Sequence, residues 1–310
     1  GCRYMGLLVV GSIALDSVET PFGSTSDAVG GSAVFFSYAA SLLHAVSAVG
    51  VVGRDFPTAE LDRLAERGVD LAGVETATGE SFRWRGRYSY DLQGRETLET
   101  RLGVFADFQP RIPEGFRDAK YVFLGNIDPE LQLSVLDQIA SPTLVACDTM
   151  NYWIESKRGV LLDLIKRIDV LMVNDSEARE LSGDWNVYRA ARWIAERGPR
   201  MVVVKQGVYG AILIRDDRIF YIPAYPLEDV FDPTGAGDAF AGGFMGHLAR
   251  SGDIGEANLR RAMVYGAAMG SFAVEAFSVG QFATIGPAEV TARVRAFADL
   301  VRFDVEPEAR

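Results

Sequence analysis

Short apolar runs, each ended by a glycine or a polar residue, recur along the chain and alternate with helical patterns. Such runs are typical of strands buried on both faces, and helices between them favour a parallel sheet. We expect strands at 7–10, 46–52, 121–125, 143–146, 170–173 and 201–205. We expect helices at 32–45, 58–67, 130–139, 161–168, 187–197, 236–249, 254–273 and 288–303, with another beginning at 176–181. This order predicts one continuous α/β domain over residues 1–310, with a mostly parallel sheet and helices on both faces.

The stretch from about 76 to 105 departs from this order. Residues 81–90 alternate aromatic with polar side chains, 91–94 supply a turn, and 96–104 alternate again. Alternation on both sides of a turn predicts a two-sided antiparallel hairpin. The hairpin is either a lid over a site or a decorative edge, and the residues alone leave both open. A second hairpin is expected from 211–214 and 219–222.

Charge and composition argue against several partners. A formal net charge of −11 over 310 residues disfavours nucleic acid, whose binders carry a basic face. The two cysteines, Cys2 and Cys147, make no disulfide framework and fit a cytoplasmic protein, and no secretory signal precedes the first strand. Residues 30–53 carry no charge, but their pattern changes from helix to strand, so we expect no membrane span. Two scattered histidines indicate no metal cluster.

Polar residues follow the ends of several expected strands. In open α/β sheets, ligands bind beyond the carboxyl ends of the strands. The residues at these ends are Asp16, Asp148, Asn174 with Glu177, Lys205, and the loop 232–238. The sequence therefore predicts a ligand site along this edge of the sheet.

The loop 232–238, Asp-Pro-Thr-Gly-Ala-Gly-Asp, leads into an apolar helix. Its small residues let an anion approach the first-turn amides, where the helix dipole also favours negative charge. Asp238 follows directly, and a carboxylate beside an anion hole suits phosphoryl transfer to a hydroxyl. The helix N-terminus should lower the pKa of Asp238 and weaken it as a base, which a loose transition state with late proton removal tolerates. The alternative is an ordinary capped helix with a tightly packed glycine.

This loop closely resembles the C-terminal motif of the PfkB (ribokinase) carbohydrate kinase family, and further stretches resemble the same family along nearly the whole chain. Val10-Gly11-Ser12 to Asp16 is similar to its opening strand and substrate aspartate. Gly30-Gly31 resembles its paired glycines at the lid hinge, followed by a helix and by 49–55. Asn174-x-x-Glu177 and the segment 202–210 resemble its magnesium-linked motif and its nucleotide-side strand and turn.

The resemblance implies a ribokinase-like fold whose β lid is formed by about 12–30 and 76–106, and an ATP-dependent kinase. The implied catalytic group is Asp238 with the anion hole Gly235, Ala236 and Gly237. The implied nucleotide side comprises Asn174, Glu177, Lys205, Gly207, Gly210, Asp232 and Thr234, with Asp148 and Asn151 nearby. The implied substrate side comprises Asp16, Gly30, Gly31, Phe35 and Asn126.

Cofactors and assembly also follow from the resemblance. Mg²⁺ would be held through water near Asn174 and Glu177, since no Walker motif occurs. A monovalent cation such as K⁺ would lie near the anion hole, on carbonyls around Asp232, Thr234, Ala273, Ala276 and Ser278. Family members often dimerise through the lid, so a homodimer is a hypothesis.

Each of these residues also has an ordinary structural interpretation. Asp16 could be a turn residue, and Gly30-Gly31 is a common turn signal. Asn174 and Glu177 have the spacing of a capping box, and Lys205 could be a solvated strand end.

The acceptor side departs from the family pattern. Ribokinase-like members often have asparagine where this chain has Ala14 and Phe35, so ribose and fructose become poorer candidates. Phe35, Phe36 and Trp84 could pack against a cyclitol or a nucleobase, although Phe35 could equally fill the core. The acceptor is thus a sugar, a nucleoside or an inositol-type cyclitol. A non-catalytic binding module is the competing class, and the intact Asp238 loop favours the enzyme.

Overall fold

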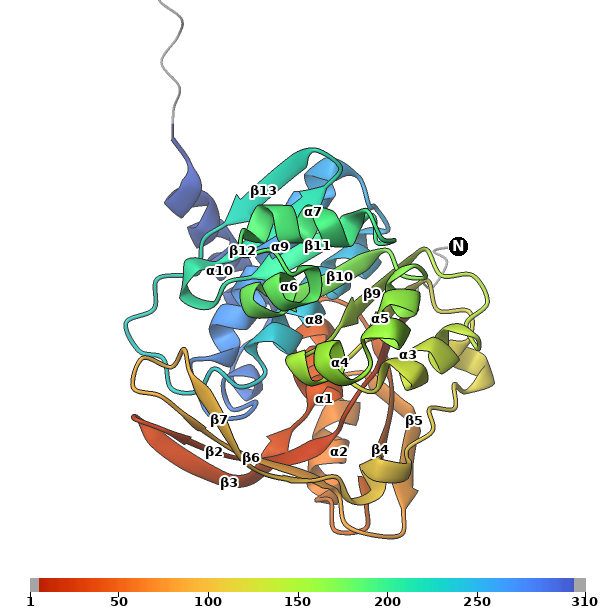
Figure 1. Ribbon diagram of the computed structural model, residues 1–310. Helices are drawn as coiled ribbons and strands as arrows, with labels where there is room; N and C mark the ends of the chain where they lie inside the picture. Colours follow the sequence, from red (N-terminus) through yellow and green to blue (C-terminus); the bar gives the residue numbers. More distant parts are fainter. Residues whose placement is uncertain (1–5, 304–310) are drawn as a thin grey trace, which may run out of the picture.

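The computed structural model describes residues 6–303 and contains a nine-stranded sheet covered by helices on both faces (Figure 1). The strand order is β13-β12-β11-β10-β9-β8-β1-β4-β5, and every neighbouring pair is parallel except those made by β12 and β13. The strands are β1 (Leu7–Val10), β4 (Val46–Gly53), β5 (Val69–Ala77), β8 (Tyr121–Leu124), β9 (Leu144–Asp148), β10 (Val170–Asn174), β11 (Met201–Lys205), β12 (Ala211–Arg215) and β13 (Arg218–Ile222). The predicted α/β class is confirmed.

The helices divide into two layers because successive strand residues point to opposite faces. In β1, Leu7 and Val9 join one hydrophobic core, and Leu8 and Val10 join the other. The first core is covered by α1 (Ser32–Ser41), α2 (Thr58–Glu66), α8 (Ala236–Ser251), α9 (Glu256–Ala273) and α10 (Pro287–Val301). The second is covered by α3 (Pro129–Leu136), α4 (Asn151–Ser156), α5 (Arg158–Ile165), α6 (Asp175–Ser182) and α7 (Val187–Ala195).

A second sheet of four strands lies beside the helix-covered sheet, at the bottom of Figure 1. Its order is β3 (Gly23–Gly30), β2 (Ala14–Thr20), β6 (Phe82–Tyr88) and β7 (Arg95–Arg101). The predicted hairpin corresponds to the antiparallel pair β6–β7, and β6 pairs in parallel with β2. We call this four-stranded sheet the lid. It joins two segments that are far apart in the sequence, so both can reach one site.

Other elements differ from the sequence predictions. Strand β5 and helix α4 were not predicted, β2 and β3 were expected only as the lid segment of about 12–30 that the resemblance implied, and the helix expected over 32–45 ends at Ser41. The uncharged stretch 30–53 divides into α1 and β4, as its change of pattern indicated. Within residues 6–303, none of the helices combines the length and the apolarity needed to cross a bilayer.

Candidate active site

The loop before α8 has glycines at positions where a larger side chain would collide with neighbouring residues. Gly235 has φ 76°, a left-handed conformation that favours glycine, and a Cβ there would collide with the ring of Phe35. A Cβ on Gly237 would lie 2.8 Å from Nζ of Lys205. Among the described residues, the amides of Gly237 and Asp238 have no hydrogen-bond acceptor, whereas Ala236 donates to Pro233 at 3.3 Å. This helix start is therefore open to an anion next to a lysine.

Asp238 lies in the first turn of α8, deep among protein atoms but still partly accessible to solvent. Burial, helped by the nearby charge of Asp148, raises the pKa of the Asp238 carboxyl from 3.8 to about 7, against the opposing effects of Lys205 and Arg95. The sequence-based expectation that the helix N-terminus would lower this pKa is wrong, because burial is the largest influence on this carboxyl and raises its pKa. A carboxyl with a pKa near neutrality is a competent general base.

Lys205, at the end of β11, is a buried partner of Asp148 at the end of β9. Its Nζ lies 3.0 Å from Oδ2 of Asp148, and the two side chains are 17% and 9% exposed. Burial disfavours the ammonium, but Asp148, Glu177 and Asp238 outweigh it and raise the pKa of Lys205. The alternative of a solvated strand end is therefore wrong. A fixed cation beside the open amides suits a phosphate.

Asn174 and Glu177 form the capping box that their spacing indicated. The Glu177 amide donates to Oδ1 of Asn174, and the Asn174 amide donates to Oε2 of Glu177, both at 2.7 Å. Burial and the charge of Asp148 raise the pKa of Glu177 to about 7, against the opposing effect of Lys205. Glu177 therefore shapes the start of α6 and also faces the carboxylates of the site.

The remaining nucleotide-side residues shape turns. Gly207 and Gly210 have φ 56° and 101°, and a Cβ on Gly210 would collide with the carbonyl of Ile222. The Asp232 carboxylate accepts from the amide of Thr234 at 2.9 Å and is 1% exposed, so it holds the loop. None of these contacts tests nucleotide binding directly, and that role stays a prediction.

On the acceptor side, Asp16 lies in β2, next to Gly30 and Gly31, which directly precede α1. Gly30 is needed beneath it because a Cβ there would collide with the Asp16 carboxylate, and the Gly31 amide (φ 95°) donates to that carboxylate. Burial, followed by the charge of Asp232, raises the pKa of Asp16 to about 7. The structure thus brings Asp16, Gly30 and Gly31 together near the α8 loop.

Two predicted substrate residues lie differently. Phe35 is 1% exposed beneath Gly235, which favours its role in the core. Asn126 follows β8, and its Oδ1 accepts from the indole of Trp153 at 3.1 Å. Substrate contact by either residue stays a prediction.

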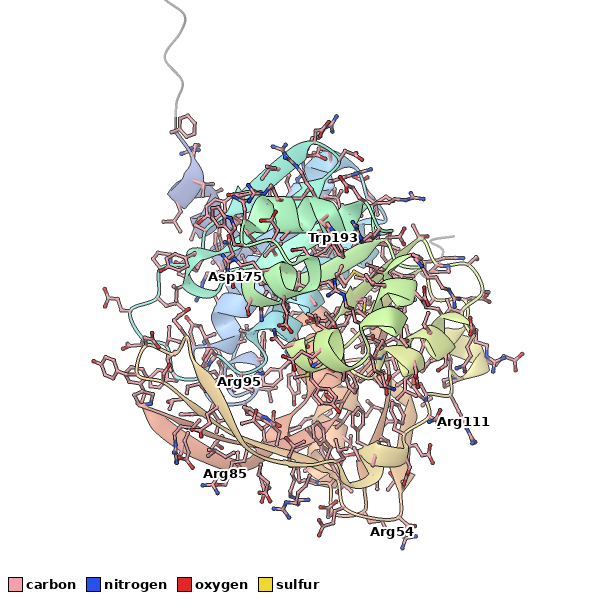
Figure 2. All side chains as sticks on the ribbon, viewed as in Figure 1. Arg54, Arg85, Arg95, Arg111, Asp175 and Trp193 are labelled. Carbon is pink, nitrogen blue, oxygen red and sulfur yellow. The ribbon has the colours of Figure 1, made fainter. Side chains whose placement is uncertain are left out.

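The lid supplies two residues that the sequence reasoning missed, Tyr88 and Arg95, which pair across β6 and β7. Thr234 donates its hydroxyl hydrogen to Oη of Tyr88 at 3.1 Å, so the lid contacts the α8 loop. Figure 2 shows Arg95 between the lid and the main sheet, whereas Arg85 points away. Arg95 lies close enough to lower the pKa of Asp16 and Asp238. The aromatic–polar alternation of the hairpin was the available signal for them.

The site combines an open helix N-terminus, a carboxyl with a pKa near neutrality, a buried lysine, and a lid that reaches the helix N-terminus and the carboxyl. This combination defines a phosphotransferase on a ribokinase-like fold. Comparison with known proteins agrees. Residues 9–284 match the pfkB family of carbohydrate kinases, and the chain belongs to this family.

Several relatives have names that describe them as kinases of nucleosides. The chain is 31% identical to a cytidine kinase of Thermococcus kodakarensis over 81% of this chain and 91% of that one. It is 28% identical to a nucleoside kinase of Methanothermobacter thermautotrophicus over 87% and 89% of the two chains. The structure of Burkholderia thailandensis nucleoside kinase in complex with inosine superposes with a TM-score of 0.80 at 22% identity, covering 94% and 98%.

These findings establish a phosphotransferase with a hydroxyl group as acceptor. The competing class, a non-catalytic binding module, gains no support from them.

Proposed function

We propose that this chain is an ATP-dependent kinase that phosphorylates a hydroxyl on the sugar of a nucleoside. The observation that carries the kinase chemistry is Asp238, whose carboxyl has a pKa of about 7 beside the open amides of the α8 loop. The nucleoside is supported by the named activities of the relatives and by Ala14 and Phe35, which replace the asparagines typical of sugar-binding members.

The residues divide the reaction as follows. Asp16 accepts a hydrogen bond from the acceptor and orients it, and Asp238 takes the proton of the attacking hydroxyl. ATP supplies the phosphoryl group. The amides of Gly237 and Asp238 and the ammonium of Lys205 stabilise the negative charge of the phosphoryl group as it is transferred between them. Because Asp238 must be ionised to act as base, turnover should fall as the pH drops through about 7.

The donor set fits indirectly bound magnesium. No group of three or more His, Cys, Asp or Glu side chains within residues 6–303 is arranged to hold a metal ion. Glu177 offers a carboxylate near Asp148, so we propose that Mg²⁺ is held there through water and the nucleotide, in the Asn174/Glu177 region. Bound in this way, it would neutralise phosphate charge.

A monovalent cation is proposed beside the α8 loop. The Ser278 amide donates to the Asp232 carboxylate, and the Phe231 amide donates to the carbonyl of Val274 at 2.8 Å. These contacts hold 231–234 against 274–278. The two segments include Asp232, Thr234, Ala276 and Ser278, four of the five residues around which carbonyls were predicted to bind K⁺, and Ala273 directly precedes the second segment. Activity that rises with added KCl, but not with LiCl, would support this site.

The test is an ADP-release screen over pentoses, hexoses, inositols and nucleosides. We expect turnover with nucleosides, its loss in Asp238→Ala with ATP affinity nearly unchanged, and normal turnover in the exposed control Asp229→Ala. Unchanged turnover in Asp238→Ala would refute the assignment of the base. Turnover with sugars or inositols alone would refute the nucleoside.

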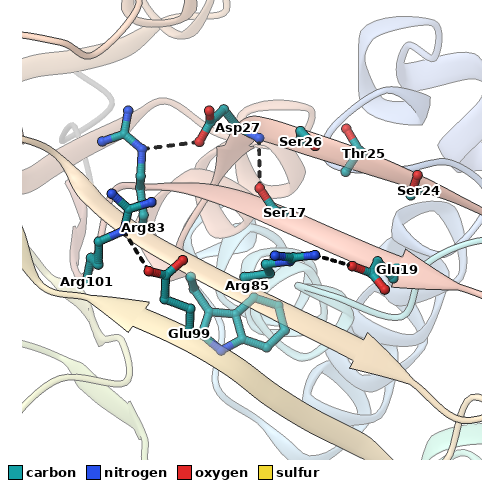
Figure 3. Close-up of a pocket in the computed structure, with 11 residues that line it drawn as sticks. Ser17, Glu19, Ser24, Thr25, Ser26, Asp27, Arg83, Arg85, Glu99 and Arg101 are labelled. Carbon is teal, nitrogen blue, oxygen red and sulfur yellow. Dashed lines mark hydrogen bonds and ion pairs between the residues drawn. The ribbon is translucent and has the colours of Figure 1, made fainter.

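A homodimer through the lid is also proposed. The lid face that points away from the site carries a polar groove of about 400 Å³ (Figure 3). Its charges alternate in sign, with Arg85 bound to Glu19 at 2.7 Å and Arg101 to Glu99 at 3.1 Å. Such a surface can complement a second copy of itself. A monomer by light scattering at micromolar concentration would contradict the dimer.

We also propose a cytoplasmic location for this protein, which the free, buried thiol of Cys147 fits.

A further inference from the structure

The indole of Trp84 lies flat against the lid because residue 86 has no side chain. A Cβ on Gly86 would collide with the six-membered ring of Trp84, and Gly86 itself is buried. The indole Nε1 donates to Oγ1 of Thr97 on the neighbouring strand at 3.3 Å. The indole is therefore held over Gly86 and Thr97, against the lid.

The indole lies on the acceptor side of the lid, and the Arg95 guanidinium lies over it. Trp84 is the direct partner of Asp16 in the β2–β6 register, so both side chains leave the same face of the lid. The guanidinium of Arg95, which points into the space under the lid, lies 5.4 Å from the centre of the indole. Arg95 is an exposed side chain, so an aromatic ligand takes the place of its guanidinium on this ring face.

Other aromatic residues near the site are less available. Phe35 and Phe36 are 1% and 0% exposed, and the ring of Phe36 stacks on Phe123 with centroids 4.7 Å apart. Trp84 keeps intermediate exposure. Of the three aromatic residues that the sequence offered for contact with a base, Trp84 therefore has the accessible ring.

We propose that the Trp84 indole, held flat by Gly86, is the platform on which the base of the acceptor stacks, and that it selects nucleosides over free sugars. This inference rests on the proposed nucleoside kinase activity. Adjacent strands lie about 4.8 Å apart. A sugar hydroxyl bound by Asp16 therefore places the attached base over the neighbouring strand, where Trp84 lies.

The test compares Trp84→Leu, Trp84→Phe and Gly86→Ala by titration calorimetry with cytidine and inosine, and by kinetics with the same nucleosides and D-ribose. Because stacking on an aromatic side chain changes affinity by about 10-fold or more, Trp84→Leu should weaken nucleoside binding by that factor. It should leave the KM values for ATP and D-ribose within about twofold. Trp84→Phe should retain most of the affinity, and Gly86→Ala, which tilts the ring, should resemble Trp84→Leu.

Matched controls are Trp185→Leu, at an exposed tryptophan, and Gly159→Ala, where a Cβ meets nothing within 4 Å. Both should behave as wild type. Unchanged nucleoside affinity in Trp84→Leu, or equal losses for nucleoside, D-ribose and ATP, would overturn the platform. A wild-type enzyme that uses only free sugars would refute the nucleoside acceptor and the platform together, while the kinase activity stands. If no acceptor turns over, calorimetry with cytidine still decides whether the platform binds a base.

Discussion

Replacing Asp238 by asparagine should abolish turnover and, at alkaline pH, make the folded protein more stable. Burial and the charge of Asp148 raise the pKa of this carboxyl from 3.8 to about 7. Above pH 7 the folded chain must therefore keep an unfavourable negative charge, which the unfolded chain carries freely in water. Asparagine has a similar size and never ionises, so Asp238→Asn removes this cost together with the base.

The size of the gain follows from the pKa. A rise from 3.8 to about 7 corresponds to roughly 4 kcal/mol at most, at about 1.36 kcal/mol per unit. Asp238 is partly accessible to solvent, and Lys205 loses a neighbouring negative charge in the variant, so we expect about 1–2 kcal/mol. For a domain of this size, that free energy raises the Tm by about 1.5–3 °C.

The pH dependence gives the reasoning its sharpest check. Between pH 3.8 and about 7 the folded wild type binds a proton at Asp238 that the unfolded chain has released, so its stability falls as the pH rises through this window. The difference in Tm between Asp238→Asn and wild type should be largest at pH 8 and shrink toward pH 4. Thermal unfolding is followed by circular dichroism without nucleotide or divalent metal, with the exposed Asp229→Asn as control. A variant that is no more stable than wild type at pH 8 would refute the argument.

Three further predictions concern the same site. Gly235→Ala, at φ 76° and against a buried ring, should lower stability by about 1–3 kcal/mol and remove turnover, which denaturant unfolding checks beside the neutral control Gly159→Ala. Lys205→Met should raise the KM for ATP and move the acidic limb of the pH–rate profile to higher pH, because the ammonium lowers the pKa of the base; an unmoved limb would contradict this. Arg95→Gln should lower kcat about 100-fold and move the same limb in the same direction, whereas Arg85→Gln on the other lid face should leave both unchanged. Equal kinetics for these two arginine variants would show that Arg95 takes no part in transfer.

The sequence predicted the central part of the fold because its strands are buried on both faces. Strand β1 is fully buried and reads as a continuous apolar run. Strand β5 lies at the edge of the sheet with alternating exposure, so its residues 69–77 give no such run. Strand β3, Gly-Ser-Thr-Ser-Asp-Ala-Val-Gly, has low strand propensity and owes its conformation to pairing with β2. Elements fixed by partners rather than by their own pattern could not be found from that pattern, and the lid segment 12–30 was expected from the family resemblance alone.

The same distinction applies to the site. Asp238 and Lys205 were predictable because one begins a recognisable helix and the other ends a recognisable strand, whereas Asp16 was expected just beyond the first strand and lies inside β2. The contact of Tyr88 with Thr234 depends on how the lid folds over residues 146 positions away, which no local pattern encodes. The pKa of Asp238 was predicted in the wrong direction because the sequence shows the helix terminus but not the burial around it.

The lid joins the two halves of the proposed reaction in one rigid element. Its β2 carries Asp16 and its β6 carries Trp84, which lie on the acceptor side. Tyr88 and Arg95, on β6 and β7, reach the α8 loop and the carboxylates of the transfer site. Because the ladder of hydrogen bonds fixes these strands relative to one another, an acceptor that seats correctly on β2 and β6 also sets the position of Arg95. Binding of the correct acceptor and completion of the transfer site are then one event, which is how a closing lid converts binding energy into specificity.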